Sequence, residues 1–275
     1  MAKRPPQQKH PEANPSDNPR GDGVGKTHQS PKEKKRLDVL LFERGLAESR
    51  QKAQAMLLAG SVRVNGQAAS KAGTATATDA AIEIVGDGLK YVGRGGLKME
   101  GALEDFGVSA AGKVCLDAGS STGGFTDCLL QNGARRVIAV DVNTQQLDWK
   151  LQRDERVARV EKNARYLLPE DVPESAELIV ADVSFISVGK ILPALIGVAK
   201  AGAIFLILVK PQFELERGDI GKGGVVRDPE LHRRAIERVR EAATVAGLDV
   251  SGVRASRVTG AEGNQEFFLH ARLKA

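Results

Sequence analysis

Short apolar runs of strand length alternate with segments of helical periodicity between residues 113 and 273, and this alternation constrains the fold more than any other feature. Strands that alternate with helices form a mostly parallel sheet with helices on both faces. Only a short polar loop separates the last two apolar runs, so we expect them to pair antiparallel. The expected strands are 113–119, 135–142, 156–160, 177–183, 203–210, 247–256 and 266–273, and the expected helices are 97–107, 124–132, 186–199 and 229–246.

A different pattern precedes this region. Apolar residues recur at helical spacing within RLDVLLFERGL at 36–46, and Ser49 is a suitable N-cap for a second helix. The dipeptide Asn65-Gly66 lies between alternating apolar and polar residues, which favours a β-hairpin turn. We therefore predict a small α+β domain at 36–86 and a larger α/β domain at 97–275.

The remaining segments have few bulky apolar residues. Residues 1–35 are rich in Pro, Gln, Ser, Gly and charge, which predicts a disordered basic tail, and the glycine-rich segment 87–96 is the expected linker. The formal net charge of +5 favours an acidic partner such as nucleic acid, although a basic protein without such a partner has the same composition. The sequence shows no signal-peptide core and no apolar run of membrane-spanning length, so we expect a cytoplasmic protein without stable membrane insertion.

A glycine-rich turn follows one of the expected strands. The stretch LDAGSSTGGF at 116–125 places Gly119, Gly123 and Gly124 where a strand leads into a helix. A turn without side chains lets the backbone approach a ligand closely. Tight packing between helix and strand explains the same turn equally well.

Two carboxylates indicate which ligand such a turn would hold. Asp117 ends the strand before the turn, and Asp141 ends the next strand, where a carboxylate accepts both hydroxyl groups of a ribose. The G-x-G-x-x-G fingerprint and the P-loop are both absent, which disfavours a nicotinamide-dependent oxidoreductase. S-adenosylmethionine fits best, with its ribose at Asp141 and its amino-acid part at the turn with Asp117. We therefore predict a Rossmann-like methyltransferase sheet.

Four further charged residues stand at unusual positions. Lys98 follows a glycine run, and Asp182, Lys210 and Glu266 lie at the ends of expected strands. Ligands bind at the carboxyl ends of strands in a parallel sheet. Each residue alone is an ordinary charge at a rim, but together beside a cofactor turn they predict an active site. No His or Cys cluster with metal-ligand spacing accompanies them, and we expect no metal site.

The stretch RLDVLLFERGLAESRQKAQAMLLAGSVRVNG resembles the RNA-binding domain first recognised in a small-subunit ribosomal protein, the S-four type. The resemblance implies that the second helix and the hairpin contact an RNA backbone. A basic helix face that is merely solvated is the alternative reading. The RNA contacts predicted on this basis are Arg36, Ser49, Arg50, Lys52 and Arg63.

The motifs YVGRGGLK, LDAGSSTGGFTD, NARYL, ADVSFIS, LVKPQFE, GKGGVVRDPELH and EGNQEFF, behind such a domain, resemble the TlyA family. These are ribosomal RNA 2′-O-methyltransferases of the FtsJ type, also described as haemolysins. The resemblance implies a catalytic tetrad of Lys98, Asp182, Lys210 and Glu266. Two departures are that Asn143-Thr144 replaces a usual Gly-Tyr pair and Gly93 replaces a common Ser. The cofactor-binding residues predicted from turn and motifs together are Asp117, Gly119, Ser120, Gly123, Gly124, Phe125, Asp141 and Asn163.

The expected reaction transfers a methyl group to a ribose hydroxyl of ribosomal RNA or a ribosomal subunit. Lys210 is either the base or a cation that steadies the developing oxyanion, and the sequence leaves both open. Phe185 and Phe213 are candidates to stack on the acceptor base, although core packing explains a Phe as well. The alternatives are a membrane-active haemolysin and a ribosome assembly factor without catalysis; the oligomeric state stays open.

Overall fold

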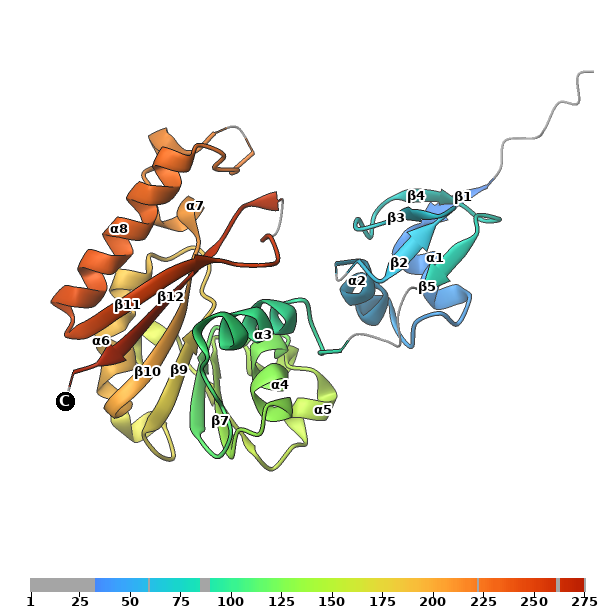
Figure 1. The fold of residues 1–275 in the computed structure, drawn as a ribbon. Helices are drawn as coiled ribbons and strands as arrows, with labels where there is room; N and C mark the ends of the chain where they lie inside the picture. Colours follow the sequence, from blue (N-terminus) through green and yellow to red (C-terminus); the bar gives the residue numbers. More distant parts are fainter. Residues whose placement is uncertain (1–32, 59, 85–89, 222, 261–262, 275) are drawn as a thin grey trace, which may run out of the picture.

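The computed structural model describes residues 33–58, 60–84, 90–221, 223–260 and 263–274. The chain forms a small N-terminal body and a larger C-terminal body (Figure 1). The expected tail therefore lies outside the described residues as far as residue 32, and so do residues 87–89 of the expected linker at 87–96.

The N-terminal body contains two short helices and two small antiparallel sheets. Its strands pair in the order β3-β2-β5 in one sheet and β1-β4 in the other. The elements are β1 (Lys34–Arg36), α1 (Leu37–Glu43), α2 (Arg50–Leu58), β2 (Val62–Val64), β3 (Gln67–Ala68), β4 (Ala75–Ala77) and β5 (Ile82–Ile84).

Local sequence explains the elements of this body. Gly45 adopts a φ of 68° just after α1, and the Ser49 hydroxyl accepts a hydrogen bond of 3.1 Å from Lys52 N at the start of α2. Asn65 and Gly66 have positive φ values of 51° and 78°, as a type I′ hairpin turn requires. A core of Leu37, Leu41, Ala47, Ala53, Met56, Leu57 and Val62 holds the elements together.

The strand β1 corrects the expectation of a disordered segment up to residue 35. Lys34 and Lys35 pair with Ala77 and Thr76 of β4 in an antiparallel ladder. The charged side chains gave no strand signal in the sequence. The ladder forms all the same, because it consists of backbone hydrogen bonds at a sheet edge, where charged side chains are tolerated.

The C-terminal body is an α/β sandwich around a seven-stranded sheet with the order β11-β12-β10-β9-β6-β7-β8. The strands β10, β9, β6, β7 and β8 run parallel, whereas β12 pairs antiparallel with both β10 and β11. The strands are β6 (Val114–Ala118), β7 (Arg136–Asp141), β8 (Val157–Glu161), β9 (Ala176–Ala181), β10 (Ala199–Val209), β11 (Leu248–Ala255) and β12 (Phe267–Leu273). The mostly parallel sheet and its antiparallel C-terminal pair are thereby confirmed.

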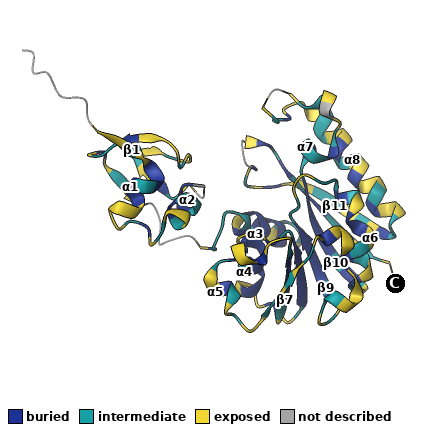
Figure 2. Ribbon diagram, turned by 180° about the vertical axis from the view of Figure 1, so that it is seen from behind, coloured by how far each residue is buried: buried dark blue, intermediate teal, exposed yellow. Residues whose placement is uncertain are grey.

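Helices cover both faces of this sheet (Figures 1 and 2). Met99, Leu129 and Leu151 of α3, α4 and α5 pack on one face, and Leu195 and Val239 of α6 and α8 pack on the other. The helices are α3 (Gly95–Phe106), α4 (Gly124–Gln131), α5 (Trp149–Gln152), α6 (Leu192–Gly197), α7 (Pro211–Glu214) and α8 (Pro229–Val245), with 3-10 turns η1 (Thr144–Gln146), η2 (Ala164–Tyr166), η3 (Pro169–Asp171), η4 (Val188–Lys190) and η5 (Arg217–Asp219).

The expected helix at 186–199 was too long. The structure has a 3-10 turn at Val188–Lys190 and then the short helix α6, and strand β10 already begins at Ala199. Pro193 lies in the first turn of α6, where its missing N–H costs nothing, and Phe185 with a φ of 65° begins an irregular loop before it.

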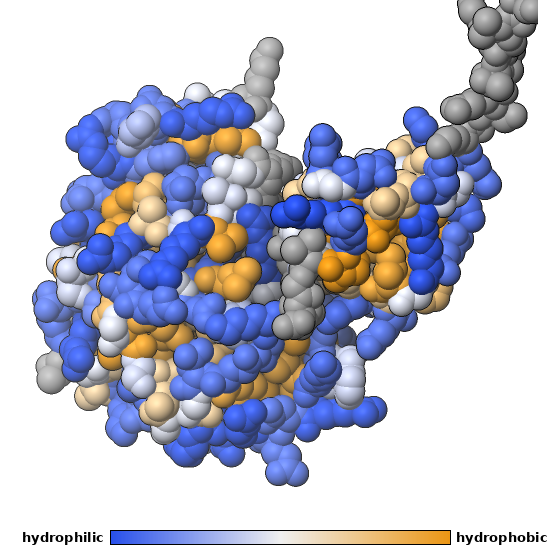
Figure 3. Space-filling view, turned by 45° about the vertical axis from the view of Figure 1, so that its right-hand side comes forward, coloured by the Kyte–Doolittle hydropathy of each residue, from blue (hydrophilic) through white to orange (hydrophobic). Residues whose placement is uncertain are grey.

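No helix among the described residues is long and apolar enough to cross a membrane. The face seen in Figure 3 shows hydrophilic residues over most of its area, with apolar residues in separate patches.

Candidate functional site

The glycine turn lies at the carboxyl end of β6, between the strand and α4. Gly119 N and Ser120 N both donate to the Val140 carbonyl, at 2.8 and 3.1 Å, which holds the turn against β7. Gly119 and Gly123 have φ values of 85° and 95°. A Cβ on Gly119 would lie 2.4 Å from the Asp182 carbonyl oxygen, and one on Gly123 would lie 2.2 Å from Leu151 Cδ1.

These contacts decide why the positions need glycine. Packing inside the protein fills the space beside each glycine, since Gly124 likewise lies against the backbone of Gly95 and Gly96. Of the two readings of the turn, tight packing accounts for the residue type. The turn nevertheless faces open space, because Gly119 and Ser121 line a cleft of about 1150 Å³.

Asp117 lies below the turn and is completely buried. Its Oδ2 accepts a hydrogen bond of 2.7 Å from the Thr126 hydroxyl, while Oδ1 has no hydrogen-bond partner among the described residues. Burial raises the pKa of the Asp117 carboxyl to about 7, and the nearby Asp182 and Asp141 charges add to the shift. The Ser120 hydroxyl is a second buried group without a described partner.

Asp141 ends β7 at the wall of a cleft of about 1150 Å³. Its Oδ2 accepts from Ser121 N at 2.9 Å, and its Oδ1 accepts from Asn143 N and from Gln146 Nε2 at 3.1 and 3.0 Å. Gln146 and Val142 also line the cleft, and sequence reasoning had missed both of them. The one sequence feature that could have indicated these two residues is their place in the loop after a strand that ends in an acidic residue.

Asn143 and Thr144, which replace the Gly-Tyr pair usual in the family, have partners within the protein. Asn143 Oδ1 accepts from Gln145 N, and the buried Thr144 donates its hydroxyl to Glu161 at 3.1 Å. Neither residue lines the cleft.

Two other predicted cofactor contacts have different surroundings. Asn163 lines the cleft, and its Oδ1 accepts from Arg165 N at 3.0 Å. Phe125 is buried, with its ring centroid 6.0 Å from that of Phe268, so most of its surface serves the core. It also lines a small pocket of about 120 Å³ together with Gly119, Ser120 and Asp182.

Strand register brings three of the four charged residues to one edge of the sheet. Val209 is opposite Phe267, so that Lys210 and Glu266 follow and precede paired positions on neighbouring strands. Ile207 pairs with Ala181, which places Asp182 at the end of the next strand. Lys98 lies on α3, which packs over the same sheet.

The four charged side chains form two ion pairs, each between a lysine and a carboxylate. Lys98 Nζ lies 2.6 Å from Glu266 Oε2, and both side chains are buried. Lys210 Nζ lies 2.5 Å from Asp182 Oδ1 and also donates to Ser184 Oγ at 2.9 Å. Only Asp182 of the four lines the cleft.

The loop after β9 contacts residues of α7. Sequence reasoning had named Phe185 and Phe213 in this region but had missed Glu214. Phe185 is 91% exposed, which excludes core packing, and its ring lies 5.1 Å from that of Phe213. The buried Glu214 accepts from the Ser187 hydroxyl at 2.6 Å and from Val188 N at 2.8 Å. Burial raises the pKa of Glu214. Glu214 therefore ties α7, which directly follows Lys210, to this loop.

The family described as FtsJ-like methyltransferase matches residues 91–273. A curated relative, the "16S/23S rRNA (cytidine-2'-O)-methyltransferase TlyA" of Mycobacterium tuberculosis, is 47% identical over 86% of this chain and 89% of its own length. The chain belongs to the TlyA family of FtsJ-like methyltransferases. "Hemolysin A" of Brachyspira hyodysenteriae is 44% identical over 86% of the chain and 98% of that protein.

A solved structure extends the TlyA-family likeness to three dimensions. The "Putative hemolysin from Streptococcus thermophilus" superposes with a TM-score of 0.70 at 42% identity, covering 89% of this chain and 90% of that one. The S4 domain family matches residues 35–75, inside the N-terminal body.

In the S4 domain, the predicted contacts Arg36 and Arg50 are held by one carboxylate. Arg36 binds the buried Asp38 with two hydrogen bonds of 2.9 Å, Gln54 donates to it at 2.8 Å, and Arg50 Nη2 lies 3.5 Å away. These donors, Arg36 foremost, hold the pKa of Asp38 well below its usual range. Both guanidinium groups remain half exposed.

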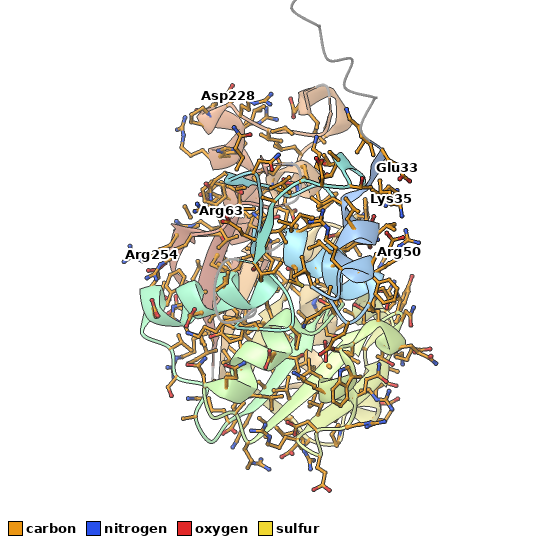
Figure 4. All side chains as sticks on the ribbon, turned by 90° about the vertical axis from the view of Figure 1, so that its right-hand side faces the viewer. Glu33, Lys35, Arg50, Arg63, Asp228 and Arg254 are labelled. Carbon is orange, nitrogen blue, oxygen red and sulfur yellow. The ribbon has the colours of Figure 1, made fainter. Side chains whose placement is uncertain are left out.

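Two of the other predicted RNA contacts of the S4 domain, Arg63 and Ser49, are not part of the ion-pair cluster at Asp38. Figure 4 shows Arg63 on the opposite side of the N-terminal body from Arg50. Ser49 is used to cap α2 through Lys52 N, so its hydroxyl already has a partner. The structure thus brings together two of the five predicted contacts.

Proposed function

We propose that this chain transfers a methyl group from S-adenosylmethionine to a ribose 2′-hydroxyl of ribosomal RNA. The observation that carries the proposal is the register of β9, β10 and β12, which brings Asp182, Lys210 and Glu266 to the sheet edge that holds the glycine turn. The name of the Mycobacterium tuberculosis relative describes it as a methyltransferase of 16S and 23S ribosomal RNA.

The residues present fit this cofactor. The buried Asp117 Oδ1 and Ser120 Oγ have no described partner, and such groups are rare in native proteins unless a ligand or water bonds them. Asp141 and Asn163 face the cleft, where a ribose and an adenine edge need polar partners. S-adenosylmethionine supplies an electrophilic methyl group carried on a sulfonium.

In the proposed roles, Lys210 orients the acceptor hydroxyl. Lys210 forms an ion pair with Asp182 and donates one hydrogen bond to Ser184, and because an ammonium has three donors, a donor remains available for the substrate oxygen. That contact would align the oxygen with the methyl group and stabilise the negative charge that develops on it as its proton passes to solvent water. Asp182 holds the ammonium in place, and the buried Lys98–Glu266 pair joins α3 to the end of β12 nearest Lys210.

The exposed Phe185 and the half-buried Phe213 are the proposed platform for the acceptor base. Lys210 Nζ lies 6.0 Å from the Phe213 centroid, and the Phe185 ring lies 5.1 Å from that of Phe213. A base that is removed from its stack gains new contacts on an aromatic face, which would bring its ribose to Lys210.

We also propose that residues 36–86 form the RNA-binding unit and 97–275 the catalytic unit. The half-exposed guanidinium groups of Arg36 and Arg50 support the first assignment, since Asp38 orders them without covering them. Arginines ordered in this way lose little entropy when they contact phosphate. Arg63 lies on another side of this body and would make a separate RNA contact.

The test is transfer of labelled methyl from S-adenosylmethionine to ribosomal subunits from a strain that lacks this gene. We expect label in RNA that resists alkali at one linkage, because a 2′-O-methyl group blocks cleavage there. The Lys210→Met protein should bind the cofactor and transfer nothing. Normal turnover by Lys210→Met would contradict the proposed role of Lys210. Labelled RNA that alkali cleaves at every linkage would contradict 2′-O-methylation.

A further inference from the structure

The only tryptophan of the chain lies outside the predicted catalytic and cofactor-binding residues. Trp149 begins the short helix α5 and is 57% exposed, although a side chain of this size normally buries most of its surface. Its neighbours in sequence, Leu147 and Leu151, are both buried. The leucines therefore anchor the segment, while Trp149, Lys150 and Arg153 are exposed.

Two cations lie against the exposed ring. Lys150 Nζ is 5.9 Å and Arg153 Cζ is 5.5 Å from the ring centroid of Trp149. Neither cation has a carboxylate at ion-pair distance within the described part of the chain, whereas the nearby Arg156 is paired with Asp154 at 2.7 Å. The patch of Trp149, Lys150 and Arg153 thus combines an open aromatic face with two uncompensated positive charges.

The patch is held firmly against the glycine turn. Asp148 N donates to the Thr122 carbonyl at 3.0 Å, and Asp148 Oδ1 accepts from Lys150 N at 3.0 Å. Leu151 fills the space beside Gly123, where a Cβ would lie 2.2 Å from it. A ligand on the patch would therefore bind next to the turn, on a surface that does not have to be ordered first.

We propose that Trp149, Lys150 and Arg153 form a second RNA contact of the catalytic unit, at which an unpaired base stacks on the indole and its flanking phosphates contact the two cations. The proposal rests on the proposed function, because it supposes that the substrate is RNA. Charge decides the class of partner: an aromatic face flanked by two cations that have no carboxylate at ion-pair distance among the described residues matches a base and its phosphates. None of these three residues belongs to the predicted catalytic tetrad or to the predicted RNA contacts of the S4 domain.

The single tryptophan makes the test direct. The full chain carrying Lys210→Met, which cannot turn over, is titrated with protein-free ribosomal RNA while indole fluorescence and retention of labelled RNA on a filter are both followed. We expect the fluorescence to be quenched in step with binding. RNA binding without any change in fluorescence would overturn the proposal and leave the proposed function standing. Absence of RNA binding would count against both.

Variants separate stacking from charge. Trp149→Leu should weaken RNA binding about tenfold, in the range found when a stacking aromatic is removed, and Trp149→Phe should recover part of the loss. The double variant Lys150→Ala with Arg153→Ala should reduce the salt dependence of binding, by a slope of about 0.7 for each lost phosphate contact. RNA affinity and salt slope equal to those of the unaltered protein would overturn the proposal.

A matched control tests whether any cation on an aromatic ring has this effect. Arg254 of β11 lies 5.9 Å from the Phe106 ring, and Arg254→Ala should leave RNA affinity unchanged. Affinity for S-adenosylmethionine is measured on every variant. An equal loss of cofactor and RNA affinity in Trp149→Leu would show that the side chain only supports the turn, and would overturn the proposal.

Discussion

Lys98 and Glu266 are 168 positions apart in sequence, yet their side chains form a buried ion pair of 2.6 Å. The pair joins α3 to the start of β12. Because each charge is almost out of contact with water, each depends on the other for compensation.

Removing one member of this pair should destabilise the fold. Lys98→Met leaves the Glu266 charge buried and unpaired, and we expect it to lower the free energy of unfolding by about 3 kcal/mol. The double variant Lys98→Met with Glu266→Leu should recover most of that loss, because no buried charge remains. Urea denaturation measures both. Lys90→Met, which breaks an exposed ion pair with Glu100, is the control and should have no measurable effect.

Asp117 should make stability depend on pH. Its pKa is raised from 3.8 to about 7 in the folded protein, so between these values the folded state binds more protons than the unfolded state. The contribution of Asp117 to stability is therefore complete below about pH 4 and is lost as the pH rises toward 7. The difference in unfolding free energy between the unaltered protein and Asp117→Asn should shift in favour of the variant over this range. A difference that is constant with pH would contradict the assignment.

Asp38 should support the S4 domain and its RNA affinity together. Asp38→Ala removes the acceptor of Arg36, Arg50 and Gln54, and we expect a loss of about 2 kcal/mol in unfolding free energy and weaker RNA binding. Because the pKa of Asp38 is lowered in the folded state, its contribution should be present above about pH 4 and disappear as the pH falls further. Glu43→Gln breaks only an exposed pair with Lys35 and should match the unaltered protein in both measurements.

The backbone conformation of Phe185 should lower the stability of the fold, while its ring should support turnover. Its φ of 65° is unfavourable for any residue except glycine, so Phe185→Gly should stabilise the fold by about 1 kcal/mol. The same change removes the exposed ring and should lower kcat/KM for ribosomal subunits about tenfold while cofactor affinity stays the same. Phe185→Leu keeps the strained backbone and loses the ring, so it should lose turnover without gaining stability. Turnover that survives both changes would rule out a stacking role.

The positions of most strands along the chain were predictable because their signals are local. The apolar runs that became β6, β7, β9 and β10, the Ser49 cap and the Asn65-Gly66 turn are each written within a few adjacent residues. The helix at 186–199 was not predictable in the same way. Its apolar content suited a helix, but the loop with Phe185 at positive φ is held by Glu214, which comes from α7.

The residues of the candidate site were visible in the sequence, but their pairing was not. Motifs placed charges at strand ends, because ends of parallel strands share one edge. Only the register of β12 between β10 and β11 decided that Glu266 would lie beside Lys210, and only the packing of α3 decided that it would bind Lys98. The sequence alone determined which elements form and which side chains are available for chemistry. Tertiary structure decided which of them meet and which are buried, since contacts between distant segments depend on how whole layers pack and carry no local signal.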